Sequence, residues 1–161
     1  MLAMNRLRAR CAAVILLVVP ACVGNFTPVQ RVQDAANDLT TATRFGRMDV
    51  AAAHVSRAGR EPFARQHAAW GNRVSIVDSE VIGLRLRDKE HADVTVTVNW
   101  QRVDESEMRT TQLMQHWRDH EGAWLLETQE RSSGDVGLIG EPTTSVPPSG
   151  GAVQFETITI R

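Results

Sequence analysis

The chain has 161 residues, 42% of them hydrophobic, and a formal net charge of −1 at pH 7. This length and apolar content are sufficient for one domain with a hydrophobic core. Three of the 18 basic residues lie in the first 21 positions, so the remainder carries 15 basic against 19 acidic side chains. This mildly acidic body argues against nucleic acid as a partner, because phosphate binding requires clustered Lys and Arg side chains.

The first 22 residues have the pattern of a secretory signal. A positively charged start is followed by an unbroken apolar run, residues 11–19, and then by Ala21 and Cys22. A run of nine residues is too short to cross a hydrocarbon core of about 30 Å, and it fits the apolar region of a signal peptide. The charged residues are Arg6, Arg8 and Arg10.

This pattern resembles a bacterial lipoprotein signal with its lipobox, although Val19-Pro20 stands where Leu-Ser or Leu-Ala is more usual. The resemblance implies a signal peptide over residues 1–21, a lipid on Cys22 and a short linker over residues 22–27. Val23 after the cysteine implies the outer membrane, if the organism has one. The alternatives are an ordinary cleaved signal peptide and an uncleaved anchor.

Residues 27–71 predict a helical layer. Thr27 is placed to cap a helix that has Pro28 in its first turn and Gln30 three residues after the cap. A second, short helix is expected over residues 49–55, and a third opens at Pro62. The apolar stripe of the first helix comprises Val29, Val32, Ala36, Leu39 and Thr43, and that of the third comprises Phe63, His67 and Trp70.

Residues 74–130 predict four β-strands joined by short charged turns. The clearest strand is 94–101, where apolar and polar residues alternate strictly. The strand at 74–87 breaks this alternation, which predicts a β-bulge between Asp78 and Gly83. Strands are also expected at 108–118 and 124–130. Strands this close in sequence pair antiparallel, so we expect an α+β fold with N-terminal helices packed on a curved antiparallel sheet of four to five strands.

Two segments carry a further resemblance. Residues 44–53 resemble the first junction between helices in the nuclear transport factor 2-like superfamily, and residues 117–126 resemble its final hairpin, in which Trp124 follows the turn. The resemblance covers residues 28–131 and implies a cone-shaped α+β domain. It implies little about function, because sites are grafted onto folds. No early strand is expected between the helices, so a cystatin-like arrangement of helix on sheet stays open.

The candidate site residues all belong to the predicted interior of the cone. His67 could act as a base with Asp78 or Glu80, or it could be a hydrogen-bonded histidine on a packing helix. The ketosteroid-isomerase type of site is excluded, because the chain contains no Tyr. The candidates for lining an apolar ligand pocket, against the alternative that they are core, are His67, Trp70, Trp100, Met114 and Trp117.

The remaining motifs predict neither a cofactor nor a metal. His116 and His120 would need a helix to bring both rings to one face, and His120 falls in a predicted turn. The glycines from Gly134 to Gly140 lack the Lys-Ser/Thr of a phosphate-binding loop. We read residues 132–151 as a linker and 152–161 as a strand, which either returns to its own sheet edge or adds to a partner's edge.

Together these patterns predict a lipid-anchored protein of the cell envelope. The expected role is non-catalytic: binding a partner protein or a small apolar ligand at the membrane surface. One alternative is an isomerase- or lyase-like enzyme that uses His67 with an acid inside the cone. Another is a structural accessory subunit of an envelope complex.

Overall fold

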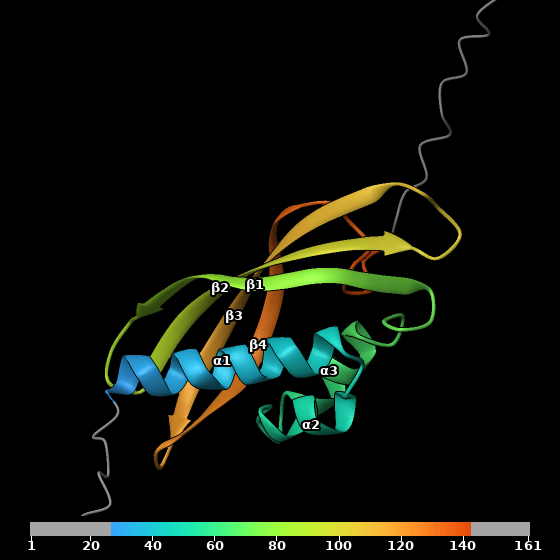
Figure 1. Ribbon diagram of the computed structural model, residues 1–161. Coiled ribbons are helices and arrows are strands. Elements are labelled where there is room, and N and C mark those ends of the chain that lie inside the picture. Colours follow the sequence, from blue (N-terminus) through green and yellow to red (C-terminus); the bar gives the residue numbers. More distant parts are fainter. Residues whose placement is uncertain (1–26, 143–161) are drawn as a thin grey trace, which may run out of the picture.

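The computed structural model describes residues 27–142. Its elements are three helices followed by four strands (Figure 1): α1 (Pro28–Arg44), α2 (Met48–Ala53), α3 (Arg60–Gln66), β1 (Val74–Leu86), β2 (His91–Arg102), β3 (Met108–His120) and β4 (Ala123–Gly134). The predicted signal peptide, Cys22 and the predicted strand at 152–161 lie outside the described residues. None of the helices within 27–142 is long and apolar enough to cross a membrane.

The start of α1 confirms the predicted cap. The Thr27 hydroxyl accepts a hydrogen bond from the backbone N–H of Gln30, and the Gln30 side chain accepts one from the backbone N–H of Thr27. This capping box satisfies two amide groups that the first helical turn would otherwise leave without partners. The buried face of the helix comprises Val32, Ala36, Leu39, Thr40, Ala42 and Thr43.

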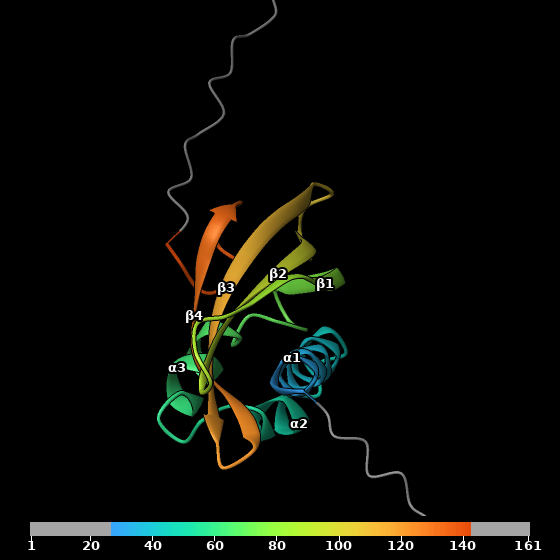
Figure 2. The same cartoon turned by 90° about the vertical axis from the view of Figure 1, so that its left-hand side faces the viewer.

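The four strands form one antiparallel sheet in the order β1-β2-β3-β4. The register of β1 against β2 shifts between Ile76 and Asp78 and again between Val81 and Gly83, which confirms the predicted bulge region. Bulges increase the local twist of a strand, and the sheet curves into the wall seen in Figure 2.

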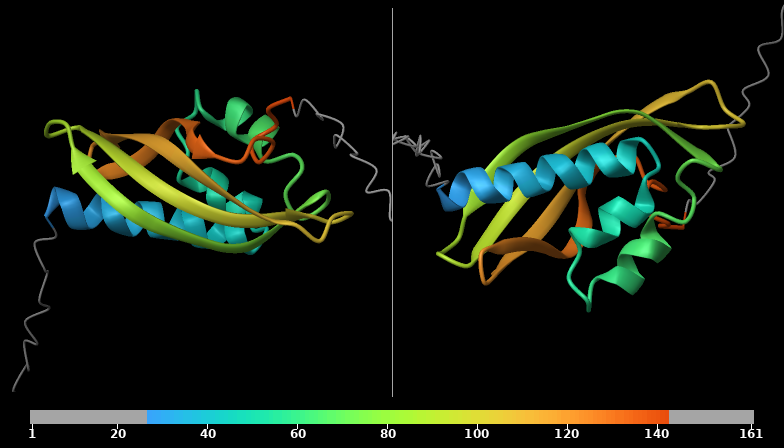
Figure 3. Two further views of the ribbon diagram at one scale, coloured as in Figure 1. Left: turned by 90° about the horizontal axis from the view of Figure 1, so that it is seen from above. Right: turned by 60° about the horizontal axis from the view of Figure 1, so that its bottom comes forward.

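The helices cover the concave side of this sheet. Figure 3 shows α1 lying across the strands, with α2 and α3 beside its C-terminal half. Alternate residues of β2 and β3 point toward the helices and are almost fully buried, among them Val94, Val96, Trp100, Leu113 and Trp117. The α+β fold class is therefore confirmed, with four strands in the described part of the chain.

The segment between α2 and α3 forms no strand, but one isolated β-bridge joins it to the edge of the sheet. Val55 pairs in parallel with Leu126 of β4, and two backbone hydrogen bonds flank the pair: Ser56 donates to Leu126, and Leu126 donates to His54. Gly59 makes this approach possible, because a Cβ there would lie 2.6 Å from the carbonyl oxygen of Glu127.

The packed domain extends beyond the predicted boundary at residue 131. Strand β4 continues to Gly134, and the segment after it returns to the core, where Leu138 and Ile139 are buried. The indole Nε1 of Trp70 donates to the carbonyl oxygen of Leu138 at 2.9 Å. The first eleven residues of the predicted linker are thus part of the domain, as far as Pro142.

Candidate functional site

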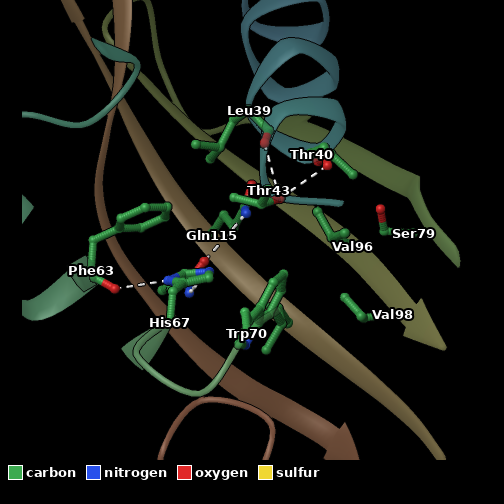
Figure 4. A pocket seen from close by; sticks show the side chains of 12 residues that line it. Leu39, Thr40, Thr43, Phe63, His67, Trp70, Ser79, Val96, Val98 and Gln115 are labelled. Atoms are coloured by element: carbon green, nitrogen blue, oxygen red, sulfur yellow. Dashed lines mark hydrogen bonds between the residues drawn. The ribbon is translucent and has the colours of Figure 1, made fainter. Parts of the chain in front are cut away.

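His67 lies at the centre of the candidate interior site. It follows the last residue of α3, and its ring packs between Phe63 and Trp70, with ring centroids 4.0 and 4.4 Å apart. The three residues that the sequence placed on one stripe therefore do contact one another (Figure 4). The His67 side chain is buried, with 5% of the residue exposed.

A chain of hydrogen bonds fixes the tautomer of His67. The indole Nε1 of Trp117 donates to Gln115 Oε1 at 3.1 Å, and Gln115 Nε2 donates to Gln129 Oε1 at 3.4 Å. Gln129 Nε2 then donates to His67 Nε2 at 3.4 Å, while His67 Nδ1 lies 2.8 Å from the carbonyl oxygen of Phe63. A carbonyl can only accept, so Nδ1 carries the proton and Nε2 is the acceptor. Every donor in this series then has an acceptor.

This environment keeps the imidazole neutral. Burial lowers the pKa of His67 to about 4 from its ordinary value of 6.5, and the bond to the Phe63 carbonyl opposes the shift only in part. Protonation at Nε2 would also place a second donor against the Gln129 amide. The ring therefore has no proton to donate into the cavity at neutral pH, and its one lone pair is already used.

The interior is almost completely filled by side chains. The cavity beside His67 has a volume of about 10 Å³, about the size that holds one water molecule. Its lining includes the hydroxyl groups of Thr40 and Ser79, both of which are buried without a hydrogen-bond partner. A drug-sized ligand needs several hundred Å³, so the interior as folded has no room for one.

No carboxylate lies among the residues that line this cavity. Asp78 is half exposed and forms an ion pair with Arg44 at 2.8 Å, and Glu80 is exposed on β1. The structure therefore does not bring His67 together with either acid. Within residues 27–142, the His67 ring has hydrogen-bond partners only in the Phe63 carbonyl and the Gln129 amide.

Of the predicted pocket residues, His67 and Trp70 line the small cavity, Trp100 and Trp117 are core residues, and Met114 is not beside them. Trp100 and Trp117 point into the concave side and are 1% exposed, and Trp100 Nε1 donates to Thr111 Oγ1 at 2.9 Å. Met114 is half-buried between the inward residues Leu113 and Gln115, so it faces the convex side of the sheet. Trp100, Met114 and Trp117 therefore do not join His67 and Trp70 in lining one pocket.

The convex side of the sheet carries an ionic cluster around Asp93. Its carboxylate lies 2.8 Å from His116 Nδ1 and 3.2 Å from Arg87 Nε. Burial raises the pKa of Asp93, but the hydrogen bond from His116 and the charge of Arg87 outweigh it and hold the pKa below the ordinary 3.8. His116 is thus engaged by a carboxylate within the sheet, and no group of three or more metal-ligating side chains exists among the described residues.

The structure also shows a groove that the sequence did not indicate. It has a volume of about 360 Å³ and lies between the C-terminal turn of α1 and the start of β1. Phe45 and Val103 stand at this groove with 68% and 66% of their surface exposed. We call it the α1–β1 groove; its lining is Thr43, Arg44, Phe45, Gly46, Gly71, Val74, Ser75, Ile76 and Val103. The one sequence signal was an aromatic residue, Phe45, at a turn between polar neighbours.

Comparisons with known proteins add no family. No family model matches the chain, and no curated protein matches it. Among solved structures, the chain is similar to a SEC-C motif-containing protein from Rhodopseudomonas palustris, with 15% identity, a TM-score of 0.49 and coverage of 58% of this chain and 72% of that one.

Two further solved structures are similar. An NTF2-like protein from Cytophaga hutchinsonii has 10% identity and a TM-score of 0.49, and the match covers 63% of this chain and 94% of that one. A protein of unknown function with a cystatin-like fold from Nostoc punctiforme has 12% identity and a TM-score of 0.44, with coverage of 67% and 91%. These three TM-scores are below 0.5, so the assignment to the α+β class rests on the strand order and packing of the chain itself.

Proposed function

We propose that this chain is a lipid-anchored protein of the cell envelope whose folded domain is a non-catalytic module that binds a partner protein. One observation carries the proposal: the interior is filled, whereas a large groove bearing two exposed apolar side chains is open to the outside. His67 is neutral and has hydrogen-bond partners at both ring nitrogens, and the cavity beside it measures about 10 Å³. The α1–β1 groove measures about 360 Å³ and carries exposed Phe45 and Val103.

Exposed apolar side chains that gather at one groove favour a binding role. Exposed apolar groups scattered singly are normal, but aromatic and aliphatic residues grouped beside a depression are typical of interaction sites. The wall of the groove is also held in place, because Arg44 donates to the carbonyl oxygen of Val77 at 3.2 Å and pairs with Asp78 at 2.8 Å. These two contacts join the end of α1 to β1 beside Phe45.

The proposed anchor on Cys22 determines which end of the domain lies near the membrane. Four residues lie between Cys22 and Thr27, so the two Cα atoms are five steps apart and at most about 17 Å from each other. A lipid on Cys22 would therefore hold the start of α1 close to the bilayer. The 17 residues of α1 extend about 25 Å at 1.5 Å each, and the groove lies at the C-terminal end of this helix, which Figure 1 shows opposite its start. The groove then lies at the end of α1 that is remote from the anchor, which leaves it free for a partner.

Intact mass and membrane fractionation test the anchor. We expect the native protein to carry diacylglyceryl and acyl mass on Cys22 and to fractionate with membranes, and the Cys22→Ala variant to lose both. An unmodified Cys22 with the wild type in the soluble fraction would contradict the anchor. The binding role is tested separately, by cross-linking from the groove, as described at the end of the Discussion.

A further inference from the structure

The α1–β1 groove lies next to the point where the described chain ends. Glu141 and Gly140 line a second hollow, of about 190 Å³, together with Val74 and Arg73. Val74 also lines the α1–β1 groove, so the two depressions share a wall. Figure 1 shows the last described residues, in red, in the half of the molecule where β1 begins. The chain therefore leaves the domain beside the second hollow, which adjoins the α1–β1 groove at Val74.

The sequence beyond this point contains an apolar segment within reach. Nine residues, 143–151, separate Pro142 from Ala152. A flexible chain of this length has a root-mean-square reach of roughly 17 Å and an extended length of about 30 Å. The segment 152–161 then supplies Val153, Phe155, Ile158 and Ile160. Phe155 is its one aromatic residue, and the groove presents an aromatic ring and aliphatic side chains to receive it.

The backbone of the groove favours side-chain insertion over strand addition. At the start of β1, Gly71 donates to the carbonyl oxygen of Val74, and Arg44 donates to that of Val77. Two register shifts further along β1 disturb its edge, and irregular edges resist pairing. On the opposite edge, the backbone of β4 at Leu126 is already bonded to residues 54 and 56. An added strand would have to displace one of these sets of bonds.

We propose that the C-terminal segment 152–161 of the same chain docks into the α1–β1 groove, with Phe155 inserted between Phe45 and Val103. A partner protein would use the same groove and so compete with the segment; this competition rests on the proposed function, but the docking itself does not.

A paramagnetic label on the segment tests the docking. In the full chain with Cys11→Ala and Cys22→Ala, Gln154→Cys is the only thiol and takes a nitroxide label. We expect loss of the amide signals of Phe45, Gly46 and Val103 in the ¹⁵N spectrum, and their return when the nitroxide is reduced. Adding Phe155→Asp should restore these signals with the label in place, whereas Glu156→Gln, on the adjacent residue, should leave the loss unchanged.

The same label separates the competing occupants. The control is a mixture of two samples: chains that carry the nitroxide but no ¹⁵N, and ¹⁵N chains that carry no nitroxide. This mixture should show no signal loss at the groove. Loss in that mixture would assign the groove to a second copy and overturn docking within one chain. Loss centred on β4 near Leu126, or no loss at any described residue, would overturn the proposal as well. Because the sample contains neither membrane nor partner, these negative results would contradict the docking without bearing on the proposed function.

Discussion

His67 and Gln129 are 62 residues apart in sequence, and their side chains meet with 3.4 Å between the ring Nε2 and the amide Nε2. The contact joins the end of α3 to β4 and continues a series of bonds that begins at Trp117. Because this series requires a neutral imidazole, it makes the stability of the domain depend on pH.

The His67 ring should cause a loss of stability as the pH falls from about 6.5 to 4. Its pKa is lowered to about 4 in the folded chain, so the unfolded chain binds a proton at a higher pH than the folded chain does. As the pH is lowered through this window, the free energy of unfolding therefore decreases, by about 3 kcal/mol in total. Urea unfolding of the wild type and His67→Gln at pH 7.5 and pH 5 measures this. The wild type should lose stability between the two pH values, and the variant should lose much less; equal slopes would contradict the neutral, buried ring.

Breaking the series at Gln115 should destabilise the domain. Gln115→Leu leaves the Trp117 indole N–H and the Gln129 carbonyl without partners in the core, which costs about 2–4 kcal/mol in the free energy of unfolding. Gln112→Leu is the matched control, because Gln112 lies on the same strand, is half-buried and bonds through its side chain only to exposed Ser133. Similar losses in the two variants would argue against the buried series.

Two substitutions of Thr by Val should have opposite outcomes. Thr111 Oγ1 accepts from Trp100 Nε1 and donates to the carbonyl oxygen of Asp135 at 2.7 Å, so Thr111→Val should cost about 2–4 kcal/mol. Thr40 Oγ1 is buried without a partner, so Thr40→Val should leave stability unchanged or raise it by about 1 kcal/mol. Thermal unfolding of both variants checks the contrast, and a loss at Thr40 as large as that at Thr111 would contradict it.

Gly59 should be required for the bridge between Val55 and Leu126. A Cβ at residue 59 would lie 2.6 Å from the backbone oxygen of Glu127, whereas one at Gly83 would meet Thr95 at an ordinary 3.6 Å. Gly59→Ala should therefore destabilise the domain by about 2 kcal/mol or more, and Gly83→Ala by less than about 1 kcal/mol. Hydrogen exchange at the Leu126 and Ser56 amides reports the bridge directly; unchanged protection in Gly59→Ala would contradict this account.

Local patterns predicted the elements of the fold well. The cap at Thr27, the bulged strand β1 and the inward face of β2 each follow from residues a few positions apart. The inward face of β3 was hidden, because Gln115 takes an inward position that an apolar residue would have marked. Without that mark, Met114 was grouped with tryptophans that lie on the other face.

The partners of the interior site could not be predicted in the same way. In the sequence, Gln129 has the character of a surface residue. Its position opposite Gln115 and beside His67 follows only from the pairing of β3 with β4. Leu138 and Ile139 follow a glycine-rich stretch typical of a linker, and their burial depends on contacts with residues far away in sequence, such as Trp70. Long-range contacts of this kind leave no local period to detect.

Photo-cross-linking from the groove in intact cells tests the central claim most directly. A photoreactive phenylalanine analogue at position 103 should give one defined adduct with a different envelope protein, and Phe45→Asp should abolish it while leaving the stability of the domain unchanged, since Phe45 is 68% exposed. The same analogue at Thr97, which faces the convex side of β2, should give no such adduct. No adduct from position 103, an adduct of two copies of this chain, or equal yields from 103 and 97 would contradict a partner-binding groove.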